Sequence, residues 1–238
     1  MPATIVGRTT KPDANKPLKA VFYGPPGSGK TQLLSTAPKP LLVDFDRGSR
    51  TLVGSDIDIF APESWDDVND VYYTFASGKH PYESILLDTV SMMQQLAEIK
   101  TDLMSAFVNG RDPRHTYGQI AAYMRDAVWK IAQLPVNVIM SAHIRIKNDE
   151  ENANPEEGTF DLVPDVTPSI LKTLSAFPDV IGRTYVRLTP KGPIYAVNFG
   201  PDPRGVAKER NLGLPNDVAN LTIPKLIELS KQKETNNE

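Results

Sequence analysis

The octet from Gly24 to Thr31, Gly-Pro-Pro-Gly-Ser-Gly-Lys-Thr, constrains the fold of this chain more than any other stretch. It fits the phosphate-binding loop pattern, in which Gly and four free positions precede Gly-Lys-Ser/Thr. Such a loop turns its own backbone N–H groups toward a phosphate, through backbone angles that a Cβ would forbid. Apolar runs predict a strand at 18–23 and a short helix at 31–36, which favours this loop over a surface turn. The octet therefore predicts nucleotide binding.

Each part of the loop has an expected task. Lys30 would reach the β- and γ-phosphates, and the Thr31 hydroxyl would ligate Mg²⁺. The helix that follows would point its unpaired N–H groups at the same anion. The predicted nucleotide-binding residues are Gly24, Pro25, Pro26, Gly27, Ser28, Gly29, Lys30, Thr31 and Gln32.

Length and composition limit the classes of protein that remain. The chain has 238 residues, of which 40% are hydrophobic, enough for one sizeable α/β core. Cysteine is absent, which excludes disulfides, thiol catalysis and Cys-based zinc sites and fits a cytosolic setting. The net charge of −3 does not indicate nucleic-acid binding, but this charge is compatible with a local basic stripe. We find neither a membrane-spanning run nor a signal-peptide pattern.

The chain divides into three predicted segments. An irregular, Pro-containing arm at 1–16 precedes a single domain at 17–230, and a polar tail at 231–238 is expected to fray.

Two predicted strands end in carboxylates. The run 40–46 ends in Asp44 and Asp46, and the run 84–88 ends in Asp88. Continuous apolarity is typical of strands buried on both faces of a parallel sheet. Because the carboxyl ends of such strands face the phosphates, Asp88 is predicted to hold Mg²⁺ and its hydration shell, with a plain turn residue as the alternative.

Further elements follow the same α/β alternation. Helices are predicted at 64–78, 89–107 and 117–134, and the aromatic residues of the first are interpreted as core. A buried strand at 136–143 then ends in His143, which is interpreted either as a structural residue or as a nucleotide sensor.

The order of these motifs resembles the RecA-like ATPase core, an α/β P-loop NTPase fold with a mostly parallel central sheet flanked by helices. Over roughly 18–229, size and motifs resemble the RecA-like single-strand annealing ATPases of phages, the Sak group. The resemblance implies ATP with Mg²⁺. It places Asp46 at the position of the carboxylate that orients the attacking water. That carboxylate is usually a Glu in these proteins. It places His143 where they have a Gln that senses the γ-phosphate, and a His there would make the relay pH-sensitive.

The resemblance also implies a DNA-binding loop directly after His143. That segment, 148–165, is acidic here, so a solvated lid is the alternative interpretation. Better candidates for the DNA backbone are basic residues at its base and in the earlier loop: Arg145, Lys147, Arg111 and Arg114.

The last third of the chain contains a further basic pair. A helix is predicted at 168–177 and a hairpin at 179–199, before Lys208 and Arg210. This Lys-x-Arg spacing looks like the pair with which hexameric helicases of the DnaB type reach the γ-phosphate bound by a neighbouring subunit. A solvated basic turn is the alternative.

The resulting hypothesis is an ATPase of phage recombination in the bacterial cytoplasm. It would bind single-stranded DNA as a homo-oligomer, filament or ring, and promote annealing or strand pairing, with a single-strand binding protein as a further partner and no membrane. The predicted catalytic residues are Lys30, Asp46, Asp88, His143, Lys208 and Arg210. An ATP-switched helicase loader or motor accessory is the alternative. A small-molecule kinase fits less well, because no acceptor-binding lid is recognisable.

Overall fold

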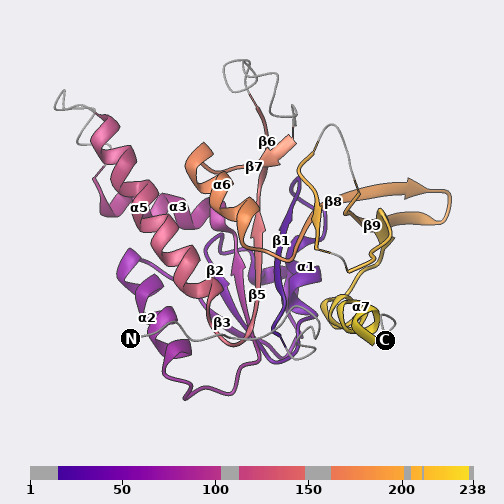
Figure 1. Ribbon diagram of the computed structural model, residues 1–238. Helices are drawn as coiled ribbons and strands as arrows, with labels where there is room; N and C mark the ends of the chain where they lie inside the picture. Colours follow the sequence, from indigo (N-terminus) through magenta and orange to yellow (C-terminus); the bar gives the residue numbers. More distant parts are fainter. Residues whose placement is uncertain (1–15, 103–112, 148–161, 201–204, 211, 236–238) are drawn as a thin grey trace, which may run out of the picture.

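The computed structural model describes residues 16–102, 113–147, 162–200, 205–210 and 212–235 (Figure 1). Most of the predicted arm, Arg111 and the 148–161 part of the predicted DNA loop lie outside the described residues.

One sheet of nine strands carries the fold, in the order β11-β9-β8-β1-β5-β4-β2-β3, with β10 paired to β8. From β3 across to β8 all neighbours are parallel, whereas β9, β10 and β11 are antiparallel additions. The predicted fold class is confirmed. The strands are β1 (Lys19–Tyr23), β2 (Pro40–Asp44), β3 (Asp58–Phe60), β4 (Ser84–Asp88), β5 (Asn137–Ala142), β8 (Val180–Thr189), β9 (Gly192–Asn198), β10 (Lys208–Glu209) and β11 (Asp217–Ala219).

The central strands are buried on both faces. Every residue of β1 and of β4 is buried, as their continuous apolar runs predict. Strand β5 lies between them, so the strand before the phosphate loop and the strand ending in Asp88 are separated by one neighbour. Their carboxyl ends meet at one edge of the sheet, where the candidate site forms.

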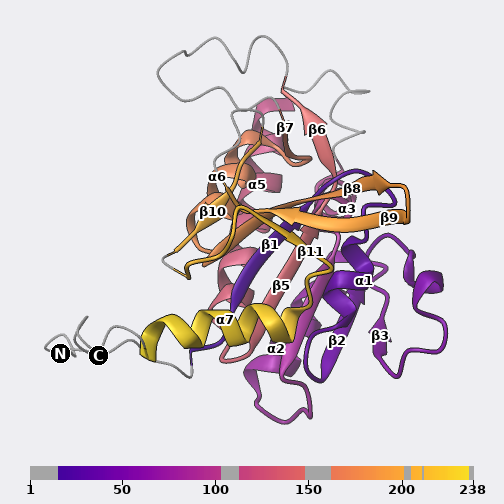
Figure 2. The same cartoon turned by 90° about the vertical axis from the view of Figure 1, so that its right-hand side faces the viewer.

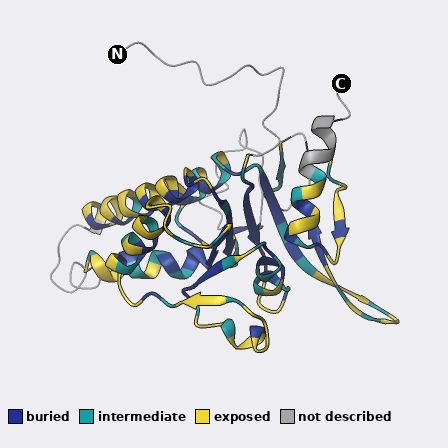
Figure 3. Cartoon of the chain, turned by 90° about the horizontal axis from the view of Figure 1, so that it is seen from below, coloured by how far each residue is buried: buried dark blue, intermediate teal, exposed yellow. Residues whose placement is uncertain are grey.

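Helices cover both faces of the sheet (Figure 2). Ala20 and Phe22 of β1 face a core shared with α1 and α7, whereas Val21 and Tyr23 face a larger core shared with the other helices. Seen from below, the buried strands form a layer between exposed helix faces (Figure 3). The helices are α1 (Lys30–Ser35), α2 (Trp65–Ala76), α3 (Val90–Lys100), α5 (Pro113–Ala132), α6 (Pro168–Ala176) and α7 (Ile223–Thr235), with a 3₁₀ turn at Ser49–Leu52.

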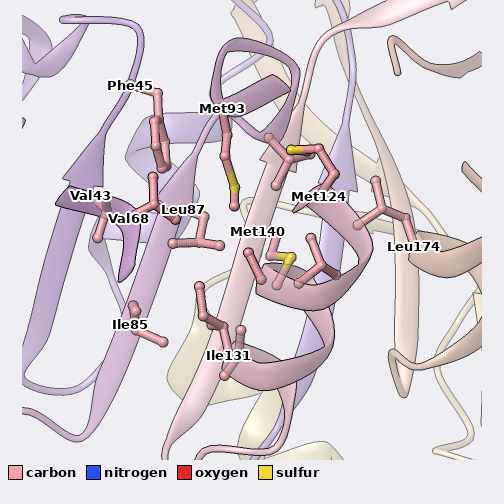
Figure 4. Packing of buried hydrophobic residues seen from close by; sticks show 14 of the residues in the cluster. Val43, Phe45, Val68, Ile85, Leu87, Met93, Met124, Ile131, Met140 and Leu174 are labelled. Carbon is pink, nitrogen blue, oxygen red and sulfur yellow. The ribbon is translucent and has the colours of Figure 1, made fainter. Parts of the chain in front are cut away.

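The larger core is filled by flexible and branched side chains from several elements. Met93 of α3, Met124 of α5 and Met140 of β5 gather between the helices and the sheet (Figure 4). Methionine fills irregular gaps well because its chain is unbranched. The core therefore joins α3 and α5 to the strands whose ends carry the predicted site residues.

Helix α2 begins after Ser64, as the sequence predicts, because Ser64 caps its first turn. The Ser64 side chain accepts a hydrogen bond from the Asp67 backbone N–H, and the Asp67 carboxylate accepts from the Ser64 backbone N–H. This reciprocal capping satisfies two helix-end donors. Trp65 and Phe75 are buried, in agreement with the core interpretation of the aromatic residues.

Several element boundaries differ from the sequence prediction. Helix α3 ends at Lys100 rather than near 107, and α5 begins at Pro113, because proline is well tolerated in the first turn of a helix. Helix α7 continues to Thr235, into the predicted tail, because its Lys, Gln and Glu residues are good helix formers. On α5, Ile120, Met124 and Ile131 are buried, whereas Tyr123 is 40% exposed.

The predicted strand 136–143 is present as β5, which is one residue shorter at each end. Strand β5 ends at Ala142, and β6 (Ile144–Ile146) pairs with β7 (Leu162–Pro164) in a separate two-stranded sheet. His143 is therefore the single residue between the main sheet and this ribbon. Strands of two or three residues, such as β3, β6, β7 and β10, are too short to show a periodic pattern.

Candidate functional site

The phosphate loop follows β1 and is shaped by its glycines. Gly27 and Gly29 have φ of 73° and 83°, values that favour glycine. Gly24 is needed for a different reason, since a Cβ there would collide with the hydroxyl of Thr184 on β8. That hydroxyl also shares a 2.7 Å hydrogen bond with the Ser28 hydroxyl. Strand β8 thus supports the loop from the side, a contact that was not predicted from the sequence.

Lys30 is the first residue of α1 and its ammonium group lies over the loop. Its Nζ donates to the carbonyl oxygens of Gly24 at 2.8 Å and Pro25 at 3.0 Å. Burial lowers the pKa of Lys30, and the nearby carboxylates of Asp88 and Asp46 oppose that shift. The positive charge is therefore placed where the backbone of the loop turns, as phosphate binding requires.

Thr31 and Asp88 meet as predicted. The Thr31 hydroxyl donates to Asp88 Oδ2 at 2.6 Å, and the Ser141 hydroxyl of β5 donates to the other carboxylate oxygen. Burial raises the pKa of Asp88, and these two hydroxyl donors oppose the rise. A serine at the penultimate position of a strand gave no sequence signal for this contact.

A hydroxyl and a carboxylate are oxygen ligands of the kind that Mg²⁺ prefers. Among the described residues no group of three or more His, Cys, Asp or Glu side chains could hold a metal. This fits Mg²⁺, which is usually held by one or two carboxylates together with substrate phosphates. Thr31 and Asp88 therefore fit the metal.

Asp46 and His143 form a direct pair. His143 Nε2 lies 3.0 Å from Asp46 Oδ2, and the Thr89 hydroxyl donates to Asp46 Oδ1 at 2.9 Å. The hydrogen bond to Asp46 raises the pKa of His143, against the effect of burial. Burial alone would raise the pKa of Asp46, but the bonds from His143 and Thr89 outweigh it and leave that pKa lowered.

The His143 backbone links this pair to two other elements. Its N–H donates to the Ser91 hydroxyl in the first turn of α3 at 3.0 Å. Its carbonyl accepts from the Asp165 N–H, just after β7, at 2.8 Å. The backbone of His143 is therefore held between α3 and the residue that follows β7.

These side chains surround one cavity of about 320 Å³. It brings together Lys30, Thr31, Asp46, Asp88 and His143, which the sequence predicted, with Thr51 and Tyr195, which it did not.

The Tyr195 ring of β9 stands over the loop, so a Cβ on Gly29 would lie 2.8 Å from its Cδ1. A second cavity of about 250 Å³ shares Gly29, Gln32 and Tyr195 with the first and continues toward Asn220 and Thr222. The two cavities together extend from the carboxylates across the loop to the β9 edge of the sheet.

Lys208 and Arg210 do not line either of these two cavities. Strand β10 pairs with Val180 and Ile181 of β8, away from the carboxyl end of β1 where the loop begins. Lys208 Nζ donates to the carbonyl oxygens of Ser175 and Ala176 at 2.8 Å each, and Arg210 Nη2 donates to that of Ala176 at 2.6 Å. Both cations therefore cap the carboxyl end of α6, and their action on a neighbouring subunit stays a prediction.

The predicted DNA contacts also stay predictions. Arg145 Nη2 donates to the Val166 carbonyl oxygen at 3.3 Å, and its Nε lies 3.8 Å from a carboxylate oxygen of Asp165. Lys147 follows the last residue of β6, and Arg114 is exposed near the start of α5.

A family model described as an AAA domain matches residues 16–211. The chain belongs to this AAA-domain family. With its loop, its acid-ending strands and its sheet order, it is a P-loop ATPase domain with a RecA-like core. No curated protein matches it. In the described part of this AAA-domain chain, no helix is long and apolar enough to cross a bilayer.

The solved structures similar to the chain include the following three proteins. The flagellar accessory protein FlaH from Methanocaldococcus jannaschii is 8% identical, with 86% of this chain and 84% of that chain covered and a TM-score of 0.45. A KaiC-like protein from Pyrococcus horikoshii OT3 is 10% identical, with 77% and 78% covered and a TM-score of 0.44. The ATPase domain of G40P is 13% identical, with 90% and 84% covered and a TM-score of 0.45.

The Asp46–His143 pair predicts a pH dependence of stability. Because the folded-state pKa of His143 lies above its ordinary value of 6.5, the pair stabilises the fold below that pH and loses this contribution as the pH rises through the raised pKa. Between about pH 6 and about pH 8.5, wild type is expected to lose more unfolding free energy than His143→Gln, measured by urea denaturation. A wild-type advantage that stays constant over this range would contradict the pairing.

Proposed function

We propose that this chain is a RecA-like ATPase that binds single-stranded DNA as a homo-oligomer and promotes annealing or strand pairing in phage recombination. One observation carries the catalytic half of this proposal. The Thr31 hydroxyl is bonded to the buried carboxylate of Asp88 at 2.6 Å, at the edge of a cavity that Lys30, Asp46 and His143 also line. This arrangement fits the binding and hydrolysis of a nucleoside triphosphate.

The loop and its lysine would receive the phosphates. Backbone N–H groups of the loop and the Lys30 ammonium would bind the β- and γ-phosphate oxygens, with Thr31 and Asp88 holding Mg²⁺. When bound, the metal neutralises charge on the phosphate oxygens. Because Lys30 and Asp88 are held by neighbouring groups, little reorganisation would accompany nucleotide binding.

Asp46 is the residue proposed to orient the attacking water. Attack by that water breaks the bond between the γ-phosphorus and the bridging oxygen, and ADP leaves with the bond electrons. The lowered pKa of Asp46 makes its carboxylate a weak base. It would therefore position the water by accepting a hydrogen bond, and phosphate oxygens would take up the proton later.

His143 is proposed to report the γ-phosphate to the rest of the molecule. Its ring lines the same cavity, and its backbone is bonded to both α3 and the residue after β7. A phosphate oxygen that competes with Asp46 for Nε2 would shift the ring and, through it, the β6–β7 ribbon, which carries Arg145 and is followed directly by Lys147. This supports a nucleotide-dependent change in DNA affinity.

The second cavity is proposed to take the base and sugar of the nucleotide. It shares Gly29 and Gln32 with the phosphate cavity, and its lining includes Tyr195, Val197 and Leu33. An aromatic ring and aliphatic side chains offer a planar base apolar contact.

The proposal predicts DNA-stimulated turnover. ATP hydrolysis by wild type is expected to rise several-fold when an oligothymidylate is added, whereas Asp88→Asn is expected to show no turnover with or without DNA. Phosphate release at saturating ATP measures both. Turnover that ignores DNA but rises with a helicase or motor protein would favour the loader alternative instead.

A further inference from the structure

The outer half of the β8–β9 hairpin projects away from the rest of the fold (Figures 1 and 3). Beyond Tyr185 the hairpin packs against little else, and Leu188 is 83% exposed. The strands stay paired as far as Thr189 and Gly192, so the projection is a regular ribbon. The tip of the hairpin is therefore accessible to a partner.

The hairpin is basic although the chain is acidic. Residues 180–200 contain three cations, Arg183, Arg187 and Lys191, and no carboxylate, while the whole chain has a net charge of −3. Arg187 and Lys191 are exposed. This is a local cationic stripe of the kind that net charge conceals.

The two arginines share one face of the ribbon with an aromatic ring. Side chains alternate along a strand, and Arg183, Tyr185 and Arg187 therefore point to the same side. The Arg183 guanidinium lies 5.9 Å from the centre of the Tyr185 ring, and the Tyr185 hydroxyl donates to Asp217 at 2.8 Å. That carboxylate also accepts from Asn198 at 3.2 Å, so the acid nearest the stripe is already engaged by two donors.

The opposite face of the same hairpin belongs to the nucleotide site. Thr184 supports the phosphate loop through Ser28, and Tyr195 lines both cavities. One rigid ribbon therefore has a face toward the nucleotide and a cationic, aromatic face toward solvent.

We propose that this outer face binds single-stranded DNA, with Arg187 and Lys191 on the phosphate backbone and a base stacked against Tyr185. The inference rests on the proposed function, which supplies the single strand, and adds a binding element to it. Cations beside an aromatic ring are the usual means of holding single strands without reading their sequence. A duplex would not present an unstacked base to the ring.

The test is a salt titration of DNA binding by the double variant Arg187→Ala/Lys191→Ala. Its affinity for a labelled oligothymidylate, measured by fluorescence anisotropy with a non-hydrolysable ATP analogue, is expected to fall at least about tenfold at low salt. The slope of log affinity against log salt is expected to flatten by about 1.4, since each phosphate contact contributes about 0.7 on single strands. ATP affinity is expected to stay at the wild-type value, because neither residue lines a nucleotide cavity.

A matched control removes the same charge elsewhere. Lys79→Ala/Lys225→Ala changes two exposed lysines next to α2 and in α7 and is expected to leave the slope unchanged. In the same assay Tyr185→Ala should weaken binding, and Tyr185→Phe, which keeps the ring, should restore it. The double variant Arg145→Ala/Lys147→Ala, titrated in the same assay, tests the DNA contacts predicted in and directly after β6.

The outcomes separate the two proposals. If wild type binds the oligonucleotide and the hairpin variant keeps its affinity and slope, the hairpin inference is wrong while the proposed function stands. If wild type binds no single strand with or without nucleotide, the proposed function itself fails. An equal loss in the Lys79/Lys225 control would reduce the effect to net charge and overturn the inference.

Discussion

Lys30→Ala is expected to lower ATP affinity by at least about 100-fold while the fold survives, because charge-assisted bonds to phosphate are lost. In the structure the ammonium group donates to the carbonyl oxygens of Gly24 and Pro25 and lies in the electrostatic field of two carboxylates. Removing it leaves the phosphates facing neutral backbone donors and the uncompensated charges of Asp88 and Asp46. Calorimetric titration with ATP and Mg²⁺ measures the affinity, and thermal unfolding checks the fold.

A control for this variant is Lys39→Ala. Lys39 also carries one positive charge, but its Nζ pairs with Glu83 at 2.6 Å on the surface, and it lines neither of the nucleotide cavities. Its loss should leave ATP affinity unchanged. Wild-type affinity in Lys30→Ala would remove the basis for assigning the loop to phosphate binding.

The parts of the site that the sequence predicted are those set by strand ends. Strand β4 begins and ends at the predicted residues, and Asp88 meets Thr31 although they are 57 positions apart. Both outcomes follow from one physical rule, because a strand buried on two faces is continuously apolar and its carboxyl end shares an edge with its parallel neighbours. The polar residue that stops such a run is thereby placed near the loop.

The parts that the sequence did not predict depend on contacts between elements with no pattern of their own. Thr184 and Tyr195 reach the loop only because β8 pairs with β1 and β9 folds back on β8. The Asp46–His143 bond joins the ends of two strands that are not neighbours in the sheet. A threonine or tyrosine in a predicted hairpin looks like any other strand residue, so nothing local marks these positions.

Arg210→Ala is expected to lower turnover by about 1,000-fold with little change in ATP affinity, if Arg210 stabilises charge on a neighbouring subunit's γ-phosphate in the transition state. The structure supplies a competing role, since Arg210 and Lys208 cap the carboxyl end of α6. A capping cation stabilises a helix end and would affect thermal stability rather than turnover. Steady-state kinetics and thermal unfolding of the same variant therefore separate the two roles. Arg210→Lys keeps the capping charge but loses the planar fork, so it should restore stability without restoring turnover.

Mixing two inactive variants tests whether the cation acts between subunits. Lys30→Ala has no functional loop but an intact Arg210, and Arg210→Ala has the reverse. In mixed oligomers some interfaces combine the intact loop of one subunit with the intact arginine of its neighbour, and these should regain part of the activity. Recovery should rise with the total protein concentration, because it depends on assembly. If the two variants co-assemble, as a tagged pull-down would show, and no turnover returns, Arg210 acts within its own chain as a helix cap and the neighbour-supplied charge must come from another residue.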